Sequence, residues 1–358
     1  MATETVVVVG GGPAGLEAAR SAADLGMHCV LVEKRDRLGG NPDSASYASI
    51  TLDTRTAREA IDAMIAEVVE HPLVDIRLET EVVARSGEPG AFQVQVQKRG
   101  ERNGTAPATI EAGALILATG FDHFDPGRET QMYGYYEFED VITLVDAERM
   151  LSAHRFVRPS TGEPPERVCF IQCVGSRDRR IGNDYCSKVC CGVASKQAIE
   201  VRQLLPNSKV FIFYIDMRMY GHWEEKIYWP AQEQYKVNYV RGIVTEILRK
   251  GDRLLIRGED TTLGRPMEVP MDVVVLSVGM EPSVGTRQVA ERLAVPQDRY
   301  GFIATPGAPL DPVSTGVEGI FVAGAAAGPK DLEDSVGMAN TAAARAVALI
   351  RRRSRVRV

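Results

Sequence analysis

Four cysteines lie close together in the middle of the 358-residue chain, with a spacing that suits metal binding. Cys173 is followed by Cys186, Cys190 and Cys191, in the pattern C-x12-C-x3-C-C. Cys173 ends a predicted strand, and Cys186 and Cys190 are one helical turn apart near the start of a helix predicted over 189–205. A helix N-terminus lowers the pKa of thiols and stabilises anionic groups. The pattern therefore predicts that four sulfur atoms meet at one place.

An iron–sulfur cluster is the use that this pattern favours, although three others are compatible with it. The cysteines could be buried as small hydrophobic side chains, form a redox disulfide, or bind structural zinc. They contain no C-x-x-C pair, and a disulfide between the adjacent Cys190 and Cys191 would close a strained ring. Zinc usually uses paired C-x2–4-C knuckles, and the spacing also differs from the C-x2-C-x2-C run of ferredoxins. Cys29 and Cys169 lie within predicted strands, where we expect core packing.

A glycine-rich turn near the N-terminus is a second motif that could do chemistry. Gly10–Gly15 reads G-G-G-P-A-G and matches G-x-G-x-x-G between a predicted strand, Thr5–Val9, and an alanine-rich helix reaching about Leu25. The glycines permit a tight turn and a close approach to a pyrophosphate. Glu33 ends the next predicted strand, where its carboxylate can accept both ribose hydroxyls of an adenosine and would repel a 2′-phosphate. The motif therefore predicts a dinucleotide site.

The order of predicted elements occurs twice along the chain. Strand, turn, helix and strand are followed by period-2 patterning over 74–98, which predicts an antiparallel meander, and by the strand Ala114–Ala118. From about residue 166 the order returns, with predicted elements at 168–172, 189–205, 209–215, 237–258 and 272–278. A further strand at 319–323 and an alanine-rich helix from about Ser335 return to the first module. We expect an α/β protein with two Rossmann-like three-layer modules, the first of them discontinuous, and joins near 121–165 and 281–300.

Further glycine turns indicate FAD rather than NAD. Glu33-Lys34 leads to the turn at Leu38–Asn41, and the turns at Ala118–Gly120 and Gly319–Gly324 follow in order. This ordered set resembles the FAD-binding flavoproteins with two dinucleotide-binding domains, such as thioredoxin reductases. The resemblance implies an FAD-binding domain at 1–125 and 283–358. It also implies a second Rossmann-like domain at 126–282, which would carry the iron–sulfur cluster.

The FAD contacts expected from this resemblance come from every one of these turns. They are Gly10, Gly12, Pro13, Ala14, Gly15, Glu33, Lys34, Gly40, Asn41, Val82, Ala118, Thr119, Gly120, Gly324, Ala325, Lys330, Asp331, Ser335 and Val336. Ser335 and Val336 are expected to direct backbone N–H groups at the flavin. Related sequences commonly place Asp after the last Ala-Gly to hold the ribityl chain. Ala325 stands there in this chain, so we expect Lys330 or Asp331 to replace that contact.

The second module has lost its own dinucleotide motif. Where a second G-x-G-x-x-G would bind NADPH, the chain has Cys173 and Asp178 at two of the three glycine positions. A bulky thiol and an acid at these positions should repel a pyrophosphate. We therefore expect no direct binding of NAD(P)H at this turn.

The cysteine stretch resembles the flavin-bearing A subunit of heterodisulfide reductases. The matching segments are 170–178 (FIQCVGSRD), 185–191 (YCSKVCC), 195–198 (SKQA), 133–135 (YGY), 141–143 (VIT), 214–218 (YIDMR) and 328–331 (GPKD). The resemblance implies FAD and a [4Fe–4S] cluster, with Cys173, Cys186, Cys190 and Cys191 as its ligands. It also implies that Lys196 reaches the N5 region of the flavin, whereas an isolated sequence would suggest a solvated helix lysine. Such a protein transfers electrons with partner subunits, and the resemblance further implies a homodimer.

Departures from the long family members favour a short form of this flavoprotein. The chain begins at the FAD strand, and we expect neither the extra N-terminal cluster domain, nor a ferredoxin-type insert, nor a C-terminal extension. It then resembles the short A-subunit-like proteins of heterodisulfide-reductase-like complexes in bacterial sulfur oxidation. The similar subunit of quinone-interacting complexes in sulfate reducers is the nearest alternative. A free-standing NAD(P)H:disulfide oxidoreductase and a non-catalytic flavin or zinc scaffold are the other classes.

The composition excludes several broader functions. The net charge is −6 with 44% hydrophobic residues, so nothing suggests a nucleic-acid partner. We expect a cytoplasmic protein, because no apolar run approaches the length of a membrane span and no signal peptide is recognisable. Six cysteines in a reducing cytoplasm suggest thiols, redox groups or metal ligands rather than structural disulfides. The tail from Arg351, RRRSRVRV, is expected to be a solvated, frayed end.

Overall fold

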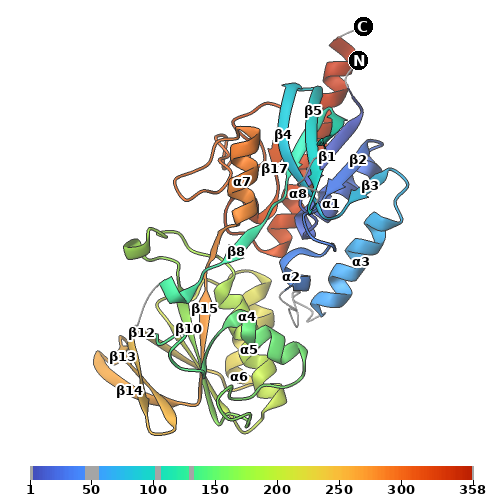
Figure 1. Ribbon diagram of the computed structural model, residues 1–358. Helices are drawn as coiled ribbons and strands as arrows, with labels where there is room; N and C mark the ends of the chain where they lie inside the picture. Colours follow the sequence, from blue (N-terminus) through green and yellow to red (C-terminus); the bar gives the residue numbers. More distant parts are fainter. Residues whose placement is uncertain (1–2, 45–55, 101–105, 129–132, 357–358) are drawn as a thin grey trace. The chain divides into compact units, whose positions relative to one another are not determined.

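The computed structural model describes residues 3–44, 56–100, 106–128 and 133–356 (Figure 1). These residues form two compact units. The first unit takes the described residues of Met1–Ser44, Arg58–Asp122 and Glu281–Val358. The second takes those of Ala45–Ala57 and His123–Met280. The chain therefore leaves the first unit and returns to it.

A parallel sheet with the strand order β17–β7–β1–β2–β3 forms the centre of the first unit. Its strands are β1 (Thr5–Val9), β2 (His28–Val32), β3 (Val74–Arg77), β7 (Ala114–Leu117) and β17 (Ile320–Val322). Val6 and Val8 of β1 point into one buried layer, and Val7 and Val9 point into another. Because both faces of the sheet are buried, β1 is an uninterrupted apolar run.

Helices cover one face of this sheet, and a second, antiparallel sheet packs on the other together with one helix. The first face carries α1 (Pro13–Asp24), α3 (Ala57–Val69) and α8 (Leu332–Val356), and the other carries α7 (Val284–Leu293) with the antiparallel strands β4 (Thr80–Glu88), β5 (Ala91–Lys98) and β6 (Ala108–Ala112). The short helix α2 (Gly40–Ser44) follows β2. Ala18 and Ala22 of α1 share one core with Ala342 and Ala346 of α8. These small side chains allow the two helices to approach closely. The last helix is thereby fixed beside the glycine-rich turn that opens α1.

The second unit is built on one larger sheet, ordered β14–β13–β12–β11–β10–β15–β9. Its strands are β9 (Val141–Thr143), β10 (Arg167–Val174), β11 (Lys209–Tyr214), β12 (Asn238–Lys250), β13 (Arg253–Asp260), β14 (Arg265–Met271) and β15 (Val273–Val278). From β9 to β11 the strands are parallel, and β12 to β14 continue as antiparallel hairpins. The helices α4 (Leu144–Ser152), α5 (Cys190–Leu204) and α6 (Trp229–Glu233) lie together beside β10 and β15 (Figure 1). The short strands β8 (Phe121–His123) and β16 (Met280–Pro282) pair separately.

The predicted meander over 74–98 was wrong in its first part. β3 pairs in parallel with β2, with Val74 opposite Cys29, and extends the central sheet. The helix α3 precedes β3, and a helical crossover brings the next strand back parallel to the previous one. The antiparallel strands begin only at Thr80.

Two segments predicted as joins contain regular elements. Residues 121–165 contain β9 and α4, and residues 281–300 contain α7. Their prolines and glycines suggested loops, but local capping starts both helices. Thr143 and Asp146 form a capping box at α4, and the Ser283 hydroxyl accepts the Thr286 N–H at α7.

The arginine-rich tail is a helix rather than a frayed end over the part that the structure describes. α8 runs to Val356, and Arg351 donates to the Leu25 carbonyl. Arg352 and Arg353 both pair with Glu318, at 3.4 and 2.8 Å. Arg357 lies outside the described residues.

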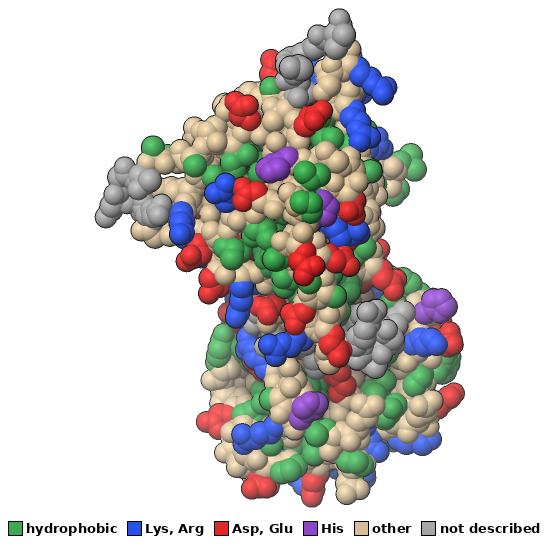
Figure 2. Space-filling view, turned by 90° about the vertical axis from the view of Figure 1, so that its right-hand side faces the viewer, with side chains coloured by type: hydrophobic (Ala, Val, Ile, Leu, Met, Phe, Trp, Pro, Cys, Tyr) green, Lys and Arg blue, Asp and Glu red, His purple; other side chains and the backbone are tan. Residues whose placement is uncertain are grey.

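Charges of both signs are interspersed on the face of the molecule drawn in Figure 2. This mixture fits the small net charge of the chain. Among the described helices, none combines the length and the apolar character that crossing a membrane requires.

Candidate functional site

The glycine motif of the first unit forms a tight turn between β1 and α1. Gly10 has a φ of +111°, and a Cβ there would collide with the Ala118 carbonyl. A Cβ at Gly15 would collide with the Gly10 carbonyl, so the helix begins directly against the turn. Pro13 opens α1, and no side chain of the described residues caps it at Gly12. The free N–H groups of the first turn, with the positive end of the helix dipole, can receive a pyrophosphate.

Glu33 lies at the end of β2, against the same turn. Its side chain is 4% exposed, and Oε2 accepts the Gly11 N–H at 2.6 Å. The other oxygen, Oε1, accepts the Arg35 N–H at 2.9 Å. The fold therefore places a buried carboxylate beside the turn, as ribose recognition requires.

The other predicted glycine turns meet this one. Gly40 packs against Gly12, since a Cβ on Gly12 would lie 3.5 Å from the Gly40 Cα. Asn41 is fixed by a 2.8 Å hydrogen bond from its side chain to the Phe121 carbonyl. A Cβ on Gly324 would lie 2.7 Å from the Ala14 Cβ, so the segment after β17 also reaches the start of α1. The structure thus brings four separate glycine segments together at the carboxyl ends of β1, β7 and β17.

Three other predicted FAD contacts have partners of their own within the first unit. The Thr119 hydroxyl lies 2.7 Å from the Thr286 hydroxyl of α7, and the carbonyls of Thr119 and Gly120 accept the hydroxyls of Ser283 and Thr286. The Val82 carbonyl accepts a hydrogen bond from Arg292 at 3.0 Å, and its side chain is buried. The Lys34 ammonium lies near Gly285, 3.2 Å from where a Cβ would stand.

The segment before α8 differs from the prediction in its helix boundary. α8 begins at Leu332, where Asp331 accepts the Asp334 N–H at 2.7 Å with its carboxylate. Ser335 donates both its N–H and its hydroxyl to the Asp331 carbonyl, at 3.1 and 2.7 Å. Its N–H is therefore an internal helix bond, and the first helical N–H groups belong to residues before it. The Lys330 ammonium lies 3.4 Å from the Pro329 carbonyl, and Ala325 is buried.

The corresponding place in the second unit has a different construction. Between β10 and α5 the tight turn is replaced by a loop over residues 175–189. A Cβ on Gly175 would collide with the Phe124 ring, which covers the glycine that remains of the motif. The loop is fastened to Met280, whose N–H donates to the Ser187 hydroxyl and whose carbonyl accepts from Tyr185, both at 2.9 Å. The contacts of Phe124 and Met280 therefore replace the open glycine turn that the first unit has.

A bulge at the end of β10 redirects Cys173. The pairing of β10 with β15 shifts register between Ile171 and Val174, and Cys173 has a φ of +65°. Arg177 and Lys188, in the same loop, also have positive φ values, of 56° and 64°. Each such residue other than glycine costs on the order of 1 kcal/mol, and such strain is concentrated at functional sites. Cys190 and Cys191 open α5 and are 3% and 4% exposed.

Cys173, Cys186 and Cys191 all lie near enough to Cys190 to influence its thiol. Burial, reinforced by the neighbouring thiols Cys191, Cys173 and Cys186, raises the pKa of Cys190 well above its usual value. Burial likewise raises the pKa of Cys191 to about 11. At Cys173 burial raises the pKa as well, and the Arg177 guanidinium opposes the rise. Cys190 and Cys191 are buried, and Cys173 and Cys186 are partly buried. Thiolates that lie close together at such a place favour a partner that carries positive charge.

The residues around these sulfur atoms fit an iron–sulfur cluster by their chemistry. The Lys188 N–H donates to the Cys186 sulfur at 3.3 Å, and the Arg218 N–H donates to Cys191. Beside Cys173, the buried side chains of Gln172 and Ser176 have polar atoms with no hydrogen-bond partner among the described residues. Such donors suit the sulfur atoms of a cluster. Within the described part of the chain, however, no three His, Cys, Asp or Glu side chains already have metal-binding geometry, so the cluster stays a prediction.

Lys196 is buried rather than solvated. Its side chain on α5 is 7% exposed, and its ammonium lies 3.6 Å from a carboxylate oxygen of Glu148 on α4, which is 2% exposed. The next residue, Gln197, donates to the Leu144 carbonyl at 2.9 Å and ties α5 to α4. A buried lysine beside a carboxylate is a common form of functional lysine.

Sequence reasoning missed three charged residues that the structure brings to these sites. Glu148 gave no signal, because its link to Lys196 joins two separate helices. Arg177 and Asp216 lie in segments that resemble the reductase family, but only the fold shows that they pair beside Cys173. Cys29 and Cys169 are fully buried in strands, which confirms the expected core packing.

Comparison with known families places the whole chain in one group. The family model described as pyridine nucleotide-disulphide oxidoreductase matches residues 4–347. The chain is 32% identical to the iron-sulfur A subunit 2 of the CoB–CoM heterodisulfide reductase of Methanopyrus kandleri, over 96% of this chain and 64% of that protein. It is 31% identical to the A subunit of the H(2):CoB-CoM heterodisulfide,ferredoxin reductase of Methanothermobacter thermautotrophicus, over 96% and 63%. The chain thus spans less than two thirds of the length of these relatives.

Solved structures share the two-module fold. A thioredoxin reductase from T. acidophilum superposes with a TM-score of 0.66 at 19% identity, covering 96% of this chain and 97% of that one. A thioredoxin reductase from Lactococcus lactis gives 0.64 at 20% identity, covering 97% and 99%. These likenesses confirm the expected thioredoxin-reductase-like α/β fold. With the matched family model and the dinucleotide turn of the first unit, they show that the chain belongs to the pyridine nucleotide-disulphide oxidoreductase family and is a flavin-dependent oxidoreductase similar to the A subunit of heterodisulfide reductases.

Proposed function

We propose that this chain is an FAD- and [4Fe–4S]-containing electron-transfer subunit of a heterodisulfide-reductase-like complex. The observation that carries the proposal is the placement of Cys173 in the bulge of β10 and of Cys190 and Cys191 at the start of α5, with Cys186 in the loop between them. A second dinucleotide would bind at that place in a protein of this fold. Two relatives are named as A subunits of heterodisulfide reductases, and one of these names includes iron–sulfur.

The first unit would hold FAD through the four glycine segments. The N-terminus of α1 would receive the pyrophosphate, and the carboxylate of Glu33 would accept the ribose hydroxyls. The backbone of Ala118–Gly120 and the segments at Gly324 and Lys330–Val336 would line the rest of the cofactor. Bound FAD takes up two electrons and can release them singly, which is the chemistry that the chain itself lacks.

The second unit would hold the cluster through Cys173, Cys186, Cys190 and Cys191. The chain contributes the strained loop that aims Cys173, the helix N-terminus that carries Cys190 and Cys191, and backbone N–H groups that donate to sulfur. Such donors stabilise the added negative charge of a reduced cluster and so raise its reduction potential. We assign to Lys196 the role of a donor to the flavin, on the basis of the family resemblance.

The cellular setting is part of the same proposal. We place the chain in a cytoplasmic heterodisulfide-reductase-like complex of sulfur oxidation, as a homodimer that works with other subunits. The relatives' names support a role within a complex, because both names designate one subunit of a larger reductase. The equivalent subunit of a quinone-interacting complex of sulfate reduction is the alternative.

Analysis of iron, acid-labile sulfide and flavin in protein purified without oxygen tests this proposal. We expect about four iron and four sulfide per FAD. Cys190→Ser should lose the iron and keep FAD, because Cys190 belongs to the second unit and the FAD turns to the first. Cys29→Ala is the matched control, since Cys29 is a buried strand cysteine of the first unit and should leave iron unchanged. Full iron retention in Cys190→Ser would refute the ligand assignment.

Reduction by nicotinamide nucleotides separates the proposal from a free-standing disulfide oxidoreductase. Because Phe124 covers Gly175 and Cys173 replaces a glycine, we expect NADH and NADPH to reduce the flavin of the isolated chain only slowly. Rapid reduction, together with flavin and no iron or sulfide, would favour the disulfide oxidoreductase instead.

A further inference from the structure

A short charged segment, called the strap below, lies beside Cys173 and Cys191. We use this name for Asp216, Met217 and Arg218, which follow β11. The Arg218 N–H donates to the sulfur of Cys191, and its guanidinium lies 3.4 Å from Asp216. The strap therefore contacts Cys191 through its backbone, and it also carries charged side chains beside the cysteines.

Arg177 connects the strap to Cys173. Both ends of its guanidinium pair with Asp216, and the Nη2–Oδ2 distance is 3.2 Å. Nη1 also lies 3.9 Å from the Cys173 sulfur, within reach of an N–H···S hydrogen bond. The Arg177 side chain is 20% exposed and Asp216 is 44% exposed, so the arginine is the inner partner. Contacts to both carboxylate oxygens of Asp216 fix the orientation of the Arg177 guanidinium, which a single contact would not do.

The backbone of Arg177 is also held in a costly conformation. Its φ is +56°, and its N–H donates to the Tyr185 carbonyl at 2.8 Å. This link crosses the loop between Cys173 and Cys186. The loop therefore accepts strain at the residue whose side chain reaches the first cysteine.

We propose that Asp216 is a positioning residue, which holds the Arg177 guanidinium against Cys173 so that Arg177 raises the reduction potential of the cluster bound there. The inference rests on the proposed function and deepens it. A positive charge and an N–H donor beside a ligand sulfur stabilise the reduced cluster more than the oxidised one. The negative charge of Asp216 by itself would lower the reduction potential. In this proposal that decrease is smaller than the increase that comes from holding Arg177 beside Cys173.

The sign of the Asp216 effect separates positioning from simple charge. If Asp216 acted only through its charge, Asp216→Asn would remove a negative charge and raise the potential. If Asp216 positions Arg177, the same substitution lets the guanidinium turn to solvent, and the potential falls toward that of Arg177→Gln. If Asp216 only stabilised the fold, the reduction potentials of the Asp216 and Arg177 variants would show no consistent order relative to the wild type.

The experiment is a redox titration of the cluster, followed by electron paramagnetic resonance, in the full chain with FAD bound. We expect more negative potentials in Arg177→Gln and Asp216→Asn, an intermediate value in Arg177→Lys, and no further fall in the double variant. Arg180→Gln is the matched control, because Arg180 lies in the same loop, is 64% exposed and pairs with Asp178. Iron release to a chelator should also be about tenfold faster in Arg177→Gln, as for the loss of one charge-assisted hydrogen bond.

Each outcome decides a separate point. A higher potential in Asp216→Asn, or an unchanged one in Arg177→Gln, would overturn the positioning role while the cluster itself stands. A wild-type chain that binds FAD without iron or sulfide would overturn the proposed function and this inference together. If Arg177→Gln assembles no cluster but keeps FAD, the potentials of Arg177→Lys and Asp216→Asn decide the question, and equality of both with the wild type would refute it.

Discussion

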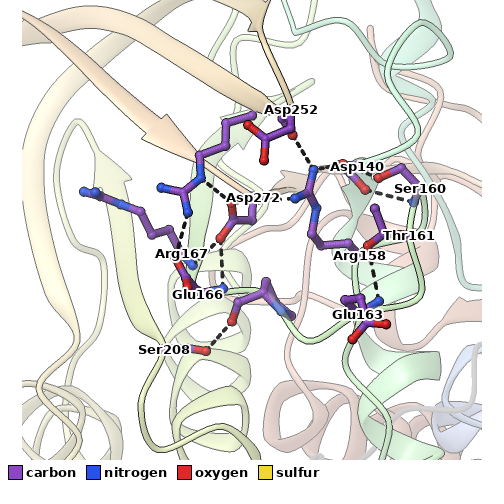
Figure 3. Close-up of polar contacts among 12 residues, drawn as sticks. Asp140, Arg158, Ser160, Thr161, Glu163, Glu166, Arg167, Ser208, Asp252 and Asp272 are labelled. Atoms are coloured by element: carbon purple, nitrogen blue, oxygen red, sulfur yellow. Dashed lines mark hydrogen bonds and ion pairs between the residues drawn. The ribbon is translucent and has the colours of Figure 1, made fainter.

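Asp272 is the centre of a buried ionic network in the second unit, and its removal should destabilise that unit strongly. One carboxylate oxygen, Oδ2, accepts the N–H groups of Glu166 and Arg167, each at 2.9 Å. The other, Oδ1, lies 3.1 Å from Arg253 and 4.0 Å from Arg158 (Figure 3). Asp272 is 2% exposed and joins the start of β10 to the turn before β15.

Two substitutions separate the backbone bonds from the charge. Asp272→Ala leaves two N–H groups without an acceptor and removes one of the two carboxylate partners of Arg158 and of Arg253, which keep Asp140 and Glu166. It should cost about 3–5 kcal/mol of unfolding free energy. Asp272→Asn can keep one oxygen at the Oδ2 position, so it should cost only about 1–2 kcal/mol. We discount the pair with Arg253 because that side chain is 35% exposed and screened by solvent. Glu246→Gln, at an exposed pair with Arg257, should change stability by less than about 0.5 kcal/mol.

Tryptophan fluorescence during urea unfolding measures this effect in the second unit alone. The chain has two tryptophans, Trp223 and Trp229, and both belong to that unit. With a slope of about 2 kcal/mol per molar urea, Asp272→Ala should lower the midpoint by about 1.5–2.5 M. Equal losses in Asp272→Ala and Asp272→Asn would show that charge rather than backbone acceptance is the larger effect. An unchanged midpoint in Asp272→Ala would refute the network as a source of stability.

Three further predictions concern the first unit. Gly15→Ala should abolish FAD retention, measured as flavin absorbance per protein, because the new Cβ would collide with the Gly10 carbonyl. The tryptophan emission of the second unit should stay unchanged. Glu33→Gln keeps an oxygen for the Gly11 N–H but loses the charge, so FAD should bind about tenfold more weakly in a flavin titration. Burial raises the pKa of Cys29 to about 12, so its thiol should stay protonated and resist iodoacetamide at pH 8 in the folded protein; mass spectrometry showing rapid labelling there would contradict this.

Sequence patterns predicted the elements around the candidate sites better than the elements that connect them. The strand, turn and helix around Gly10–Gly15 were predictable because local rules determine them, from the apolar run to the glycine turn and the alanine-rich helix. The cysteine pattern likewise predicted a shared site, because it places Cys173 at the end of a strand and Cys190 at the start of a helix. In contrast, β3 looks like part of a meander in sequence, and only the crossover through α3 makes it parallel.

The pairs that tune the sites were beyond sequence reasoning for a physical reason. Lys196 and Glu148 lie on different helices, and Arg177 and Asp216 lie on opposite sides of β11 in sequence. Such pairs follow from tertiary packing and from charges that need a partner once buried, not from any local period. An isolated helix would suggest a solvated Lys196, whereas Glu148 of α4 lies beside its ammonium and the side chain is buried.

The two modules of the chain solve one electrostatic problem in two ways. In each, a parallel strand ends where a helix begins, and the helix N-terminus offers N–H groups to an anionic group. The first module has Gly10 and Gly15 at its turn, where the backbone is unstrained and, in the proposed function, would approach a phosphate. The second keeps only Gly175 of the three motif glycines, and Cys173, Arg177 and Lys188 also adopt positive φ values. In the proposed function, side chains that carry sulfur and charge are what a cluster needs and a phosphate does not, and the strain at these three residues is the cost of positioning them.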